Sequence, residues 1–309
     1  MRAGHTREPA ITKLTASGAG RHFGNTSTSE PSVKYGRARN WLLENDMSAL
    51  PARHNHAKAK LAAGENLTAF MVELPSVGLV QVLAASGVDV LIFDMEHGPI
   101  DMQSLHAMVA ATCGTPVTPI VRIPWTEPWL VKTALETGAM GINFPMISTP
   151  ELARRASESL RYPPNGSRGY APSLAAARWG VSGPEYIRAA DSELLNVITI
   201  EDAQSVEQLD EILAVPGIDV AAIASFDLSM SLGVPGQFDH PEVQALVRKA
   251  EEKVRRAGTP LGGVALDAQT AHKKRAAGYR MLLLAFDVMM IEQAARGIVQ
   301  RAAAPADKG

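Results

Sequence analysis

Eight short apolar segments alternate with segments of helical pattern from about residue 55 to the end of the chain. The apolar segments are nearly continuous hydrophobic runs, which are typical of strands in a parallel sheet whose faces are covered by helices. Eight repeats favour a closed (β/α)8 barrel over an open doubly wound sheet. The sequence therefore predicts the α/β class and a (β/α)8 TIM barrel. The predicted strands are 69–74, 88–96, 118–124, 141–147, 194–201, 220–228, 260–266 and 281–288.

The N-terminal part of the chain has a different composition. Residues 1–46 are rich in Ser, Thr and Gly and lack apolar periodicity, so we expect them to be disordered. A transit peptide would also be basic and Ser-rich, but acidic residues such as Glu8 and Glu30 argue against one. Alternatively, Met47 is the true start and the upstream residues are not native. The predicted division is an extension over 1–54 and the barrel over 55–309.

The composition argues against several functions. Hydrophobic residues make up 46% of the 309 residues, enough for a large buried core. A net charge of −2 argues against a nucleic-acid surface or a polybasic membrane surface. The single cysteine, Cys113, excludes an intramolecular disulfide and a cysteine-based zinc site. No apolar run approaches the roughly 20 residues of a membrane span. We therefore expect a soluble, cytoplasmic protein that binds neither nucleic acid nor membranes.

Polar residues gather where the predicted strands end. In a (β/α)8 barrel the active site is built at the carboxyl ends of the strands, so these residues are expected to meet at one mouth. Burying a charged group without a partner is unfavourable by several kcal/mol, and groups that converge can compensate one another. The residues concerned are Asp94, Glu96, His97, Arg122, Glu201 and Asp227.

Glu201 and Asp227 follow adjacent predicted strands, so their carboxylates can point at one place. Two carboxylates so close repel each other unless a proton or a cation lies between them. Oxygen ligands suit a hard divalent ion such as Mg²⁺ or Mn²⁺. The alternative is that one carboxylate caps the following helix while the other pairs with Arg122.

His97 leads into a Gly-Pro turn, which leaves its imidazole at the mouth, where it can move protons. Asp94 and Glu96 lie on one side of their strand. One of them could orient His97, and the other could pair with a lysine or arginine from a neighbouring strand. Arg122 is either such a partner or a binding group for a substrate carboxylate or a developing oxyanion.

Several segments carry a resemblance to a known family. "LIFDMEHGPID", "PIVRIP", "RYPPNGSRGY", "ITIED" and "FDLSMSLGVPGQFDHPEV" occur in the order seen in the HpcH/HpaI aldolases, which are class II, metal-dependent aldolases of 2-keto acids in the phosphoenolpyruvate/pyruvate barrel superfamily. The resemblance covers about residues 57 to 300. It implies a domain-swapped barrel whose last helix packs on a neighbour, in a homo-oligomer that is a hexamer or a trimer.

The resemblance also implies roles for individual residues. Glu201 and Asp227 would bind Mg²⁺, Mn²⁺ or Co²⁺, which pyruvate chelates. Arg122 would stabilise the enolate oxygen. His97, with Asp94 nearby and through a metal-bound water, would handle the proton of the aldehyde or hydroxyl oxygen. Glu136 stands where the family commonly has an Asp that assists the histidine.

The sequence departs from the family pattern around the substrate. Thr199 replaces a common Gln, Ala224-Ser225-Phe226 replaces a Gly-Pro turn, and Met71 stands where an aromatic residue is frequent. Thr199 and Ser225 could restore hydrogen bonds to the substrate by their side chains, or could fit a different 2-oxo acid. Arg168 belongs to a long Pro- and Gly-punctuated excursion over 161–192, which is expected to shape specificity.

The expected function is reversible cleavage of a 4-hydroxy-2-oxo acid to pyruvate, or a related 2-oxo acid, and an aldehyde through a metal-bound enolate. No lysine stands at a predicted strand end, which fits a metal in place of a Schiff base. The alternatives are decarboxylation of a 2-oxo diacid such as oxaloacetate at the same site, and a non-catalytic keto-acid-binding subunit.

Overall fold

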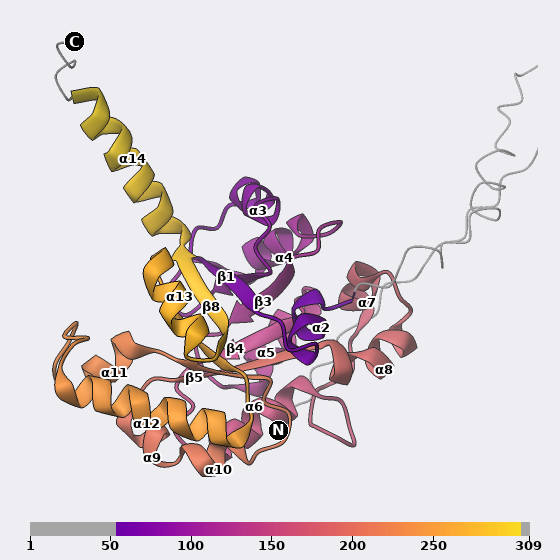
Figure 1. Ribbon diagram of the computed structural model, residues 1–309. Helices are drawn as coiled ribbons and strands as arrows, with labels where there is room; N and C mark the ends of the chain where they lie inside the picture. The colour runs from indigo at the N-terminus through magenta and orange to yellow at the C-terminus, as the bar shows by residue number, and fades with distance from the viewer. Residues whose placement is uncertain (1–53, 304–309) are drawn as a thin grey trace, which may run out of the picture. The chain divides into compact units, whose positions relative to one another are not determined.

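The computed structural model describes residues 54–303, in which eight parallel strands close into a barrel in sequence order (Figure 1). The predicted (β/α)8 fold is confirmed. The predicted N-terminal extension lies outside the described residues, except for His54. The strands are β1 Leu67–Val72, β2 Val90–Asp94, β3 Thr118–Arg122, β4 Gly141–Phe144, β5 Leu195–Ile200, β6 Val220–Ile223, β7 Leu261–Val264 and β8 Tyr279–Phe286.

Helices surround the barrel and connect its strands (Figure 1). Several of them begin where a Ser, Thr or Asp side chain accepts a hydrogen bond from the first helical turn, as Ser76, Asp101 and Thr149 do. The helices are α2 His56–Ala62, α3 Val77–Ala84, α4 Met102–Ala111, α5 Pro128–Glu136, α6 Pro150–Leu160, α7 Ser173–Trp179, α8 Gly183–Glu193, α9 Ala203–Glu207, α10 Leu209–Leu213, α11 Ser225–Ser231, α12 Pro241–Ala257, α13 Ala268–Ala276 and α14 Asp287–Ala303.

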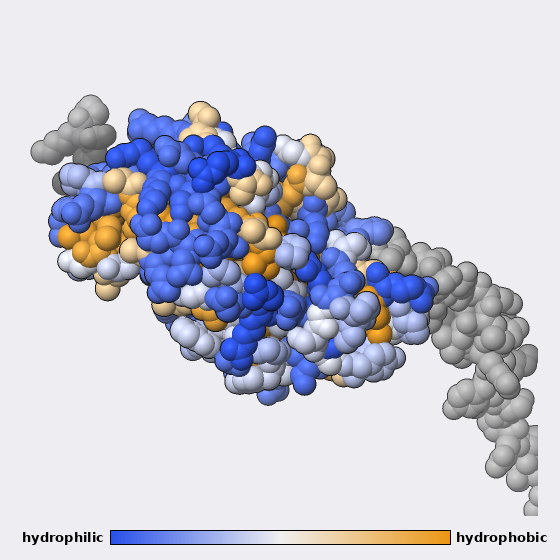
Figure 2. All heavy atoms as spheres, turned by 90° about the horizontal axis from the view of Figure 1, so that it is seen from below, coloured by the Kyte–Doolittle hydropathy of each residue, from blue (hydrophilic) through white to orange (hydrophobic). Residues whose placement is uncertain are grey.

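The apolar core has two layers. An inner cluster lies inside the barrel, where residues of neighbouring strands lie in register, such as Met71 beside Ile92 and Ile92 beside Ile120. An outer cluster fills the space between strands and helices. Much of the face in Figure 2 is hydrophilic, with smaller separate hydrophobic areas. The alternation of inward and outward residues along each strand thus serves both layers.

The N-terminal end of the barrel is closed by α2, which the sequence analysis did not predict. Ala57 of α2 is fully buried in the inner cluster. The Asn55 side chain caps the helix and donates to the carbonyl oxygens of Met140 and Glu193, at 2.9 and 2.7 Å. With this end closed, the barrel interior is reached from the carboxyl ends of the strands.

The predicted elements differ from the observed ones mainly at the mouth. The predicted strand 220–228 ends at Ile223, and Ser225–Ser231 form α11. The predicted excursion 161–192 contains α7 and most of α8. The final helix begins at Asp287, which is buried, whereas most of α14 is exposed. Within residues 54–303, no helix is long and apolar enough to span a bilayer.

Candidate active site

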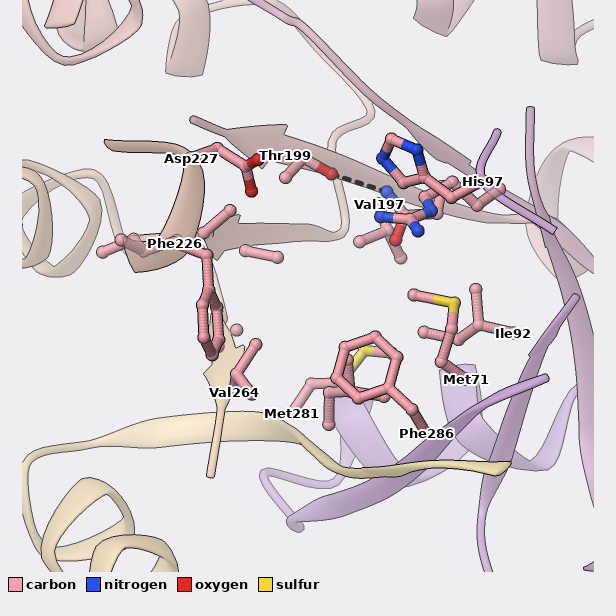
Figure 3. A pocket seen from close by; sticks show the side chains of 18 of the residues that line it. Met71, Ile92, His97, Val197, Thr199, Phe226, Asp227, Val264, Met281 and Phe286 are labelled. Atoms are coloured by element: carbon pink, nitrogen blue, oxygen red, sulfur yellow. Dashed lines mark hydrogen bonds between the residues drawn. The ribbon is translucent and has the colours of Figure 1, made fainter. Parts of the chain in front are cut away.

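A cavity of about 300 Å³ lies at the carboxyl ends of the strands and reaches into the barrel (Figure 3). Its polar lining comes from β1 to β5 and from α11. Four of the nine predicted site residues line it: His97, Arg122, Thr199 and Asp227. The carboxyl ends of the strands therefore surround a cavity that several of the predicted polar residues line.

Arg122 is held by two carboxylates. Its Nε and Nη2 donate to the two oxygens of Asp94 at 2.8 and 2.6 Å, and Nε lies 3.2 Å from Glu96 Oε2. Burial alone would lower the pKa of Arg122, but the hydrogen bonds and charge of Asp94, with Glu96, outweigh burial and raise it. The guanidinium is thus a fixed positive charge that faces the cavity. Its rigid fork suits a carboxylate or an oxyanion.

Asp94 and Glu96 both contact Arg122, but only Glu96 also lies beside the His97 ring. Asp94 is fully buried, and besides Arg122 it accepts from the backbone N–H groups of Glu96 and His97. The His97 ring lies instead beside Glu96, whose Oε2 is 3.6 Å from His97 Nε2. Asp94 therefore positions Arg122 and shapes the turn, and Glu96 is the carboxylate next to the imidazole.

The turn after β2 presents His97 to solvent. Its side chain is 65% exposed. Gly98 follows because a Cβ there would lie 2.5 Å from the Asp94 carbonyl oxygen and 2.9 Å from that of Glu73. The close approach of these two chain segments requires glycine and fixes the position of the histidine at the mouth.

Glu201 follows β5 and is 7% exposed. One of its oxygens accepts from the N–H of Met146, a residue with a φ of 55° in the loop after β4. Burial raises the pKa of Glu201 to about 7; the Met146 hydrogen bond opposes this, and the charges of Asp227 and Glu96 add to it. A buried carboxyl with this environment needs either a proton or a cation.

Asp227 lies in the first turn of α11 and not at a strand end as predicted. Its carboxylate makes no capping bond, since the N-cap of α11 is Ala224 and no side chain caps it. Arg122 pairs with Asp94 and Glu96 rather than with Glu201. The contacts therefore do not support the alternative in which one carboxylate caps the helix and the other pairs with Arg122.

The charge balance around the cavity fits a divalent cation. Carboxylates outnumber cationic groups, and burial raises the pKa of Glu73, Glu96 and Glu201. Within residues 54–303 no group of three or more His, Cys, Asp or Glu side chains is arranged to hold a metal. Glu201 and Asp227 would thus supply two ligands, and water or substrate oxygens the others.

Metal-free protein should lose stability as the pH rises from about 5 to about 8. Because the folded state raises the pKa of Glu201 from 4.5 to about 7, the folded state binds more protons in this range than the unfolded state does. The free energy of unfolding then falls with rising pH, by at most roughly 3 kcal/mol from this group. Urea unfolding in EDTA at several pH values measures the slope.

The matched comparison is Glu201→Gln against Glu207→Gln. Glu207 is exposed and its pKa is lowered by Lys249. The first variant should have a shallower slope than wild type, and the second should keep it. Equal slopes in wild type and Glu201→Gln would show that Glu201 does not titrate in this range.

Two lining residues were missed by the sequence analysis. Asn143 on β4 donates from Nδ2 to Thr199 Oγ1 at 2.7 Å, drawn as the dashed line in Figure 3. Glu73, just after β1, also lines the cavity. Asn143 is a polar residue within the apolar "GINF" strand, so the criterion that singled out Arg122 applies equally to it.

Five predicted site residues do not line the cavity: Asp94 and Glu201, which are buried, and Ser225, Arg168 and Glu136. Ser225 is the first residue of α11 and does not line the cavity. Arg168 is 4% exposed, with its guanidinium 4.7 Å from the Tyr162 ring centroid and Nη2 donating to the Tyr186 hydroxyl at 3.0 Å. Glu136 belongs to the same cluster, because its charge acts on the pKa of both tyrosines. Within one chain, Glu136 does not reach His97, since α5 runs from the mouth toward the other end of the barrel.

In (β/α)8-barrel enzymes the active site lies at the carboxyl ends of the strands, which is where this chain has its acidic, basic and imidazole groups. The chain belongs to the HpcH/HpaI aldolase/citrate lyase family, whose profile matches residues 69–294. This confirms the resemblance drawn from the sequence. The chain is a lyase of the aldolase type.

Named relatives and a solved structure support this membership. A hydroxypyruvate/pyruvate aldolase of Roseovarius nubinhibens is 36% identical over 247 residues, which cover 80% of this chain and 96% of that protein. A 2-keto-3-deoxy-L-rhamnonate aldolase of Klebsiella pneumoniae is 36% identical over 78% of this chain and 90% of its own length. The crystal structure of an HpcH/HpaI aldolase/citrate lyase family protein from Burkholderia cenocepacia superposes with a TM-score of 0.77, at 33% identity, over 81% of this chain and 100% of that one.

Proposed function

We propose that this protein cleaves a 4-hydroxy-2-oxo acid reversibly to pyruvate, or a related 2-oxo acid, and an aldehyde, as a class II aldolase. The observation that carries the proposal is one cavity lined by Arg122, His97 and Asp227. Glu201 lies close enough that the charges of Asp227 and Arg122 act on its pKa. The aldolase names of its relatives favour the same chemistry. No lysine lines this cavity among the described residues, as a metal-dependent rather than Schiff-base enzyme requires.

Glu201 and Asp227 are the residues that would hold the divalent cation, Mg²⁺, Mn²⁺ or Co²⁺. When bound, such an ion withdraws electron density from the keto oxygen of the substrate. Arg122 binds the substrate anion and offsets the negative charge that develops at that oxygen during cleavage. Its position is fixed beforehand by Asp94, so little reorganisation is needed as the charge develops.

His97 takes the proton of the C4 hydroxyl in the cleavage direction and returns it in the synthesis direction. Its exposed ring at the mouth suits a group that meets the aldehyde as it enters or leaves. Glu96, beside the ring, stabilises the imidazolium that forms. As the C3–C4 bond breaks, its electron pair moves toward the keto oxygen, on which Arg122 acts.

The test is a panel of 4-hydroxy-2-oxo acids, with oxaloacetate as the competing substrate, assayed with Mg²⁺ or Mn²⁺ and with EDTA. The proposal expects aldehyde and 2-oxo acid in equal amounts, with loss of cleavage in EDTA. Release of pyruvate from oxaloacetate alone, with no cleavage of any hydroxy acid, would instead indicate a decarboxylase.

Replacing Arg122 by Lys should lower kcat/KM for cleavage by about 10²-fold. The lysine keeps a positive charge but loses the two-pronged contact with Asp94 and the fixed donors aimed at the substrate. Steady-state kinetics measure the loss, and circular dichroism verifies the fold. Arg155→Lys is the matched control, because Arg155 pairs with Glu127 at 2.7 Å on the surface. Equal, small effects of the two substitutions would contradict the role given to Arg122.

We also propose that the protein is a homo-oligomer, a hexamer or a trimer, in which α14 packs on a neighbouring copy. Ile291, Ile298 and Val299 of this helix are 48%, 60% and 67% exposed, an apolar stripe that water disfavours. Ile298→Asp should therefore shift the assembly toward smaller species in analytical ultracentrifugation. An unchanged sedimentation coefficient would contradict this packing.

A further inference from the structure

The side of the cavity opposite its polar groups is apolar, and we call this side the floor. Figure 3 shows His97, Thr199 and Asp227 on one side, with Val264, Met281, Phe286 and Met71 on the other. These four apolar residues come from β7, β8 and β1.

Small residues on two neighbouring strands line this space. Ala222 on β6 and Gly262 on β7 lie in register, and both line the cavity. A Cβ at Gly262 would lie 2.9 Å from Val220 Cγ1 and 3.1 Å from Ala222 Cα, so a larger residue does not fit there without a shift. Barrel interiors are usually filled by branched side chains. Ala222 instead presents only a methyl group to the cavity.

The floor favours an apolar group of a ligand over ordered water. The side chains of the floor, Val264, Met281, Phe286 and Met71, are apolar and offer water few hydrogen-bond partners. Ordered water needs two to four polar partners. A ligand that fills this space carries an apolar group.

We propose that the 2-oxo acid half of the substrate carries an apolar substituent of about two carbons or more on C3, and that this substituent occupies the floor. This rests on the proposed function. The oxo-acid end is placed at Arg122 and the cation-binding carboxylates, and the aldehyde end at His97 near solvent. The group that faces the floor is then the C3 substituent and not the aldehyde chain.

The reaction is balanced for a substrate R′–CH(OH)–CHR–CO–COO⁻. The C4 hydroxyl gives up its proton, the C3–C4 bond breaks and R′–CHO leaves, while the electron pair passes to the keto oxygen. C3 then takes up a proton to give R–CH₂–CO–COO⁻. The same C3 proton can exchange with solvent in the absence of any aldehyde, so the donor half can be measured by itself.

The experiment follows deuterium incorporation at C3 by NMR, with Mg²⁺, for pyruvate, 2-oxobutanoate and 2-oxopentanoate. Each buried methylene should raise kcat/KM for exchange by about fourfold, and 2-oxopentanoate, with two more methylenes, should therefore exceed pyruvate by roughly fifteenfold. Isothermal titration gives a second readout: 2-oxobutanoate should bind more tightly than hydroxypyruvate, which carries a hydroxyl in place of the added methyl.

Ala222→Leu fills the floor and should reverse the preference, so that pyruvate exchanges faster than 2-oxopentanoate. Val264→Phe, from the β7 wall, tests the same point if the first variant does not fold. The control is Ala257→Leu on the exposed end of α12, which should keep the wild-type order.

The outcomes separate this inference from the function it rests on. If pyruvate exchanges as fast as the longer acids and Ala222→Leu leaves the order unchanged, the inference is overturned while the aldolase proposal stands. It is equally overturned if chain length matters only in the aldehyde. If no 2-oxo acid exchanges and no hydroxy acid is cleaved, the proposed function itself fails.

Discussion

Glu201→Ala should abolish cleavage, with a loss in kcat/KM of about 10⁴-fold or more. Polarisation of the substrate by a bound cation contributes several kcal/mol to catalysis, and each 1.36 kcal/mol is a factor of ten in rate. With Glu201 removed, Asp227 is left as the one protein ligand of the proposed pair. Asp227 lies in the first turn of an exposed helix end and cannot hold a hard cation alone. Steady-state assays of the purified variant measure the loss.

EDTA treatment of the wild type should reproduce this loss, and added Mg²⁺ should restore the wild type but not the variant. Glu207→Ala is the matched control, because Glu207 is exposed on α9 and pairs with Lys249 at 2.6 Å. It should stay within about twofold of wild type. If EDTA and Glu201→Ala both leave cleavage untouched, a cation at this site plays no part in the reaction.

The fold could be predicted because the hydrophobic pattern and the number of repeats agree. All eight strands were found, and their central residues lie where the apolar runs place them. The main error lies at the mouth of the barrel. The strand predicted over 220–228 ends at Ile223, and the residues from Ser225 onward form α11. The apolar run "VAAIASF" does not mark the point where the chain leaves the sheet, because buried helix turns and buried strands share the same composition there.

The division of work between Asp94 and Glu96 could not be predicted from the sequence. Period-2 spacing puts both on one side of the strand, but the turn at Gly98 moves the second one away from that pattern. In the structure, Arg122 Nη2 donates to Asp94 Oδ2 at 2.6 Å, and Glu96 Oε2 lies 3.6 Å from His97 Nε2.

The apolar floor is a property that single residues do not reveal. Ala222 and Gly262 are ordinary in sequence, and only the structure shows that both line one cavity. Arg122 and Glu201 could be found because a charge within an apolar run is conspicuous. A small residue within an apolar run is ordinary, so the shape of the substrate pocket needs the structure.

His97→Ala should lower kcat/KM for cleavage by about 10³-fold while leaving C3 proton exchange of the 2-oxo acid within about threefold of wild type. General acid–base catalysis by a positioned side chain contributes about 10²–10⁴-fold, and the proposed role of His97 concerns only the oxygen of the aldehyde. Exchange at C3 involves no aldehyde, and depends instead on Arg122 and the groups that hold the cation. The two measurements on one variant therefore separate the two ends of the site.

The control is His272→Ala, since His272 is exposed on α13 outside the cavity lining, and both rates should remain at wild-type values. A loss of both cleavage and exchange in His97→Ala would place the imidazole on the donor, as the base at C3. A loss of neither would remove His97 from the reaction and leave Glu96, 3.6 Å from its ring, as the nearest group able to move the proton. Retained exchange with lost cleavage is the one result that assigns His97 to the aldehyde oxygen, because only that step is absent from the exchange reaction.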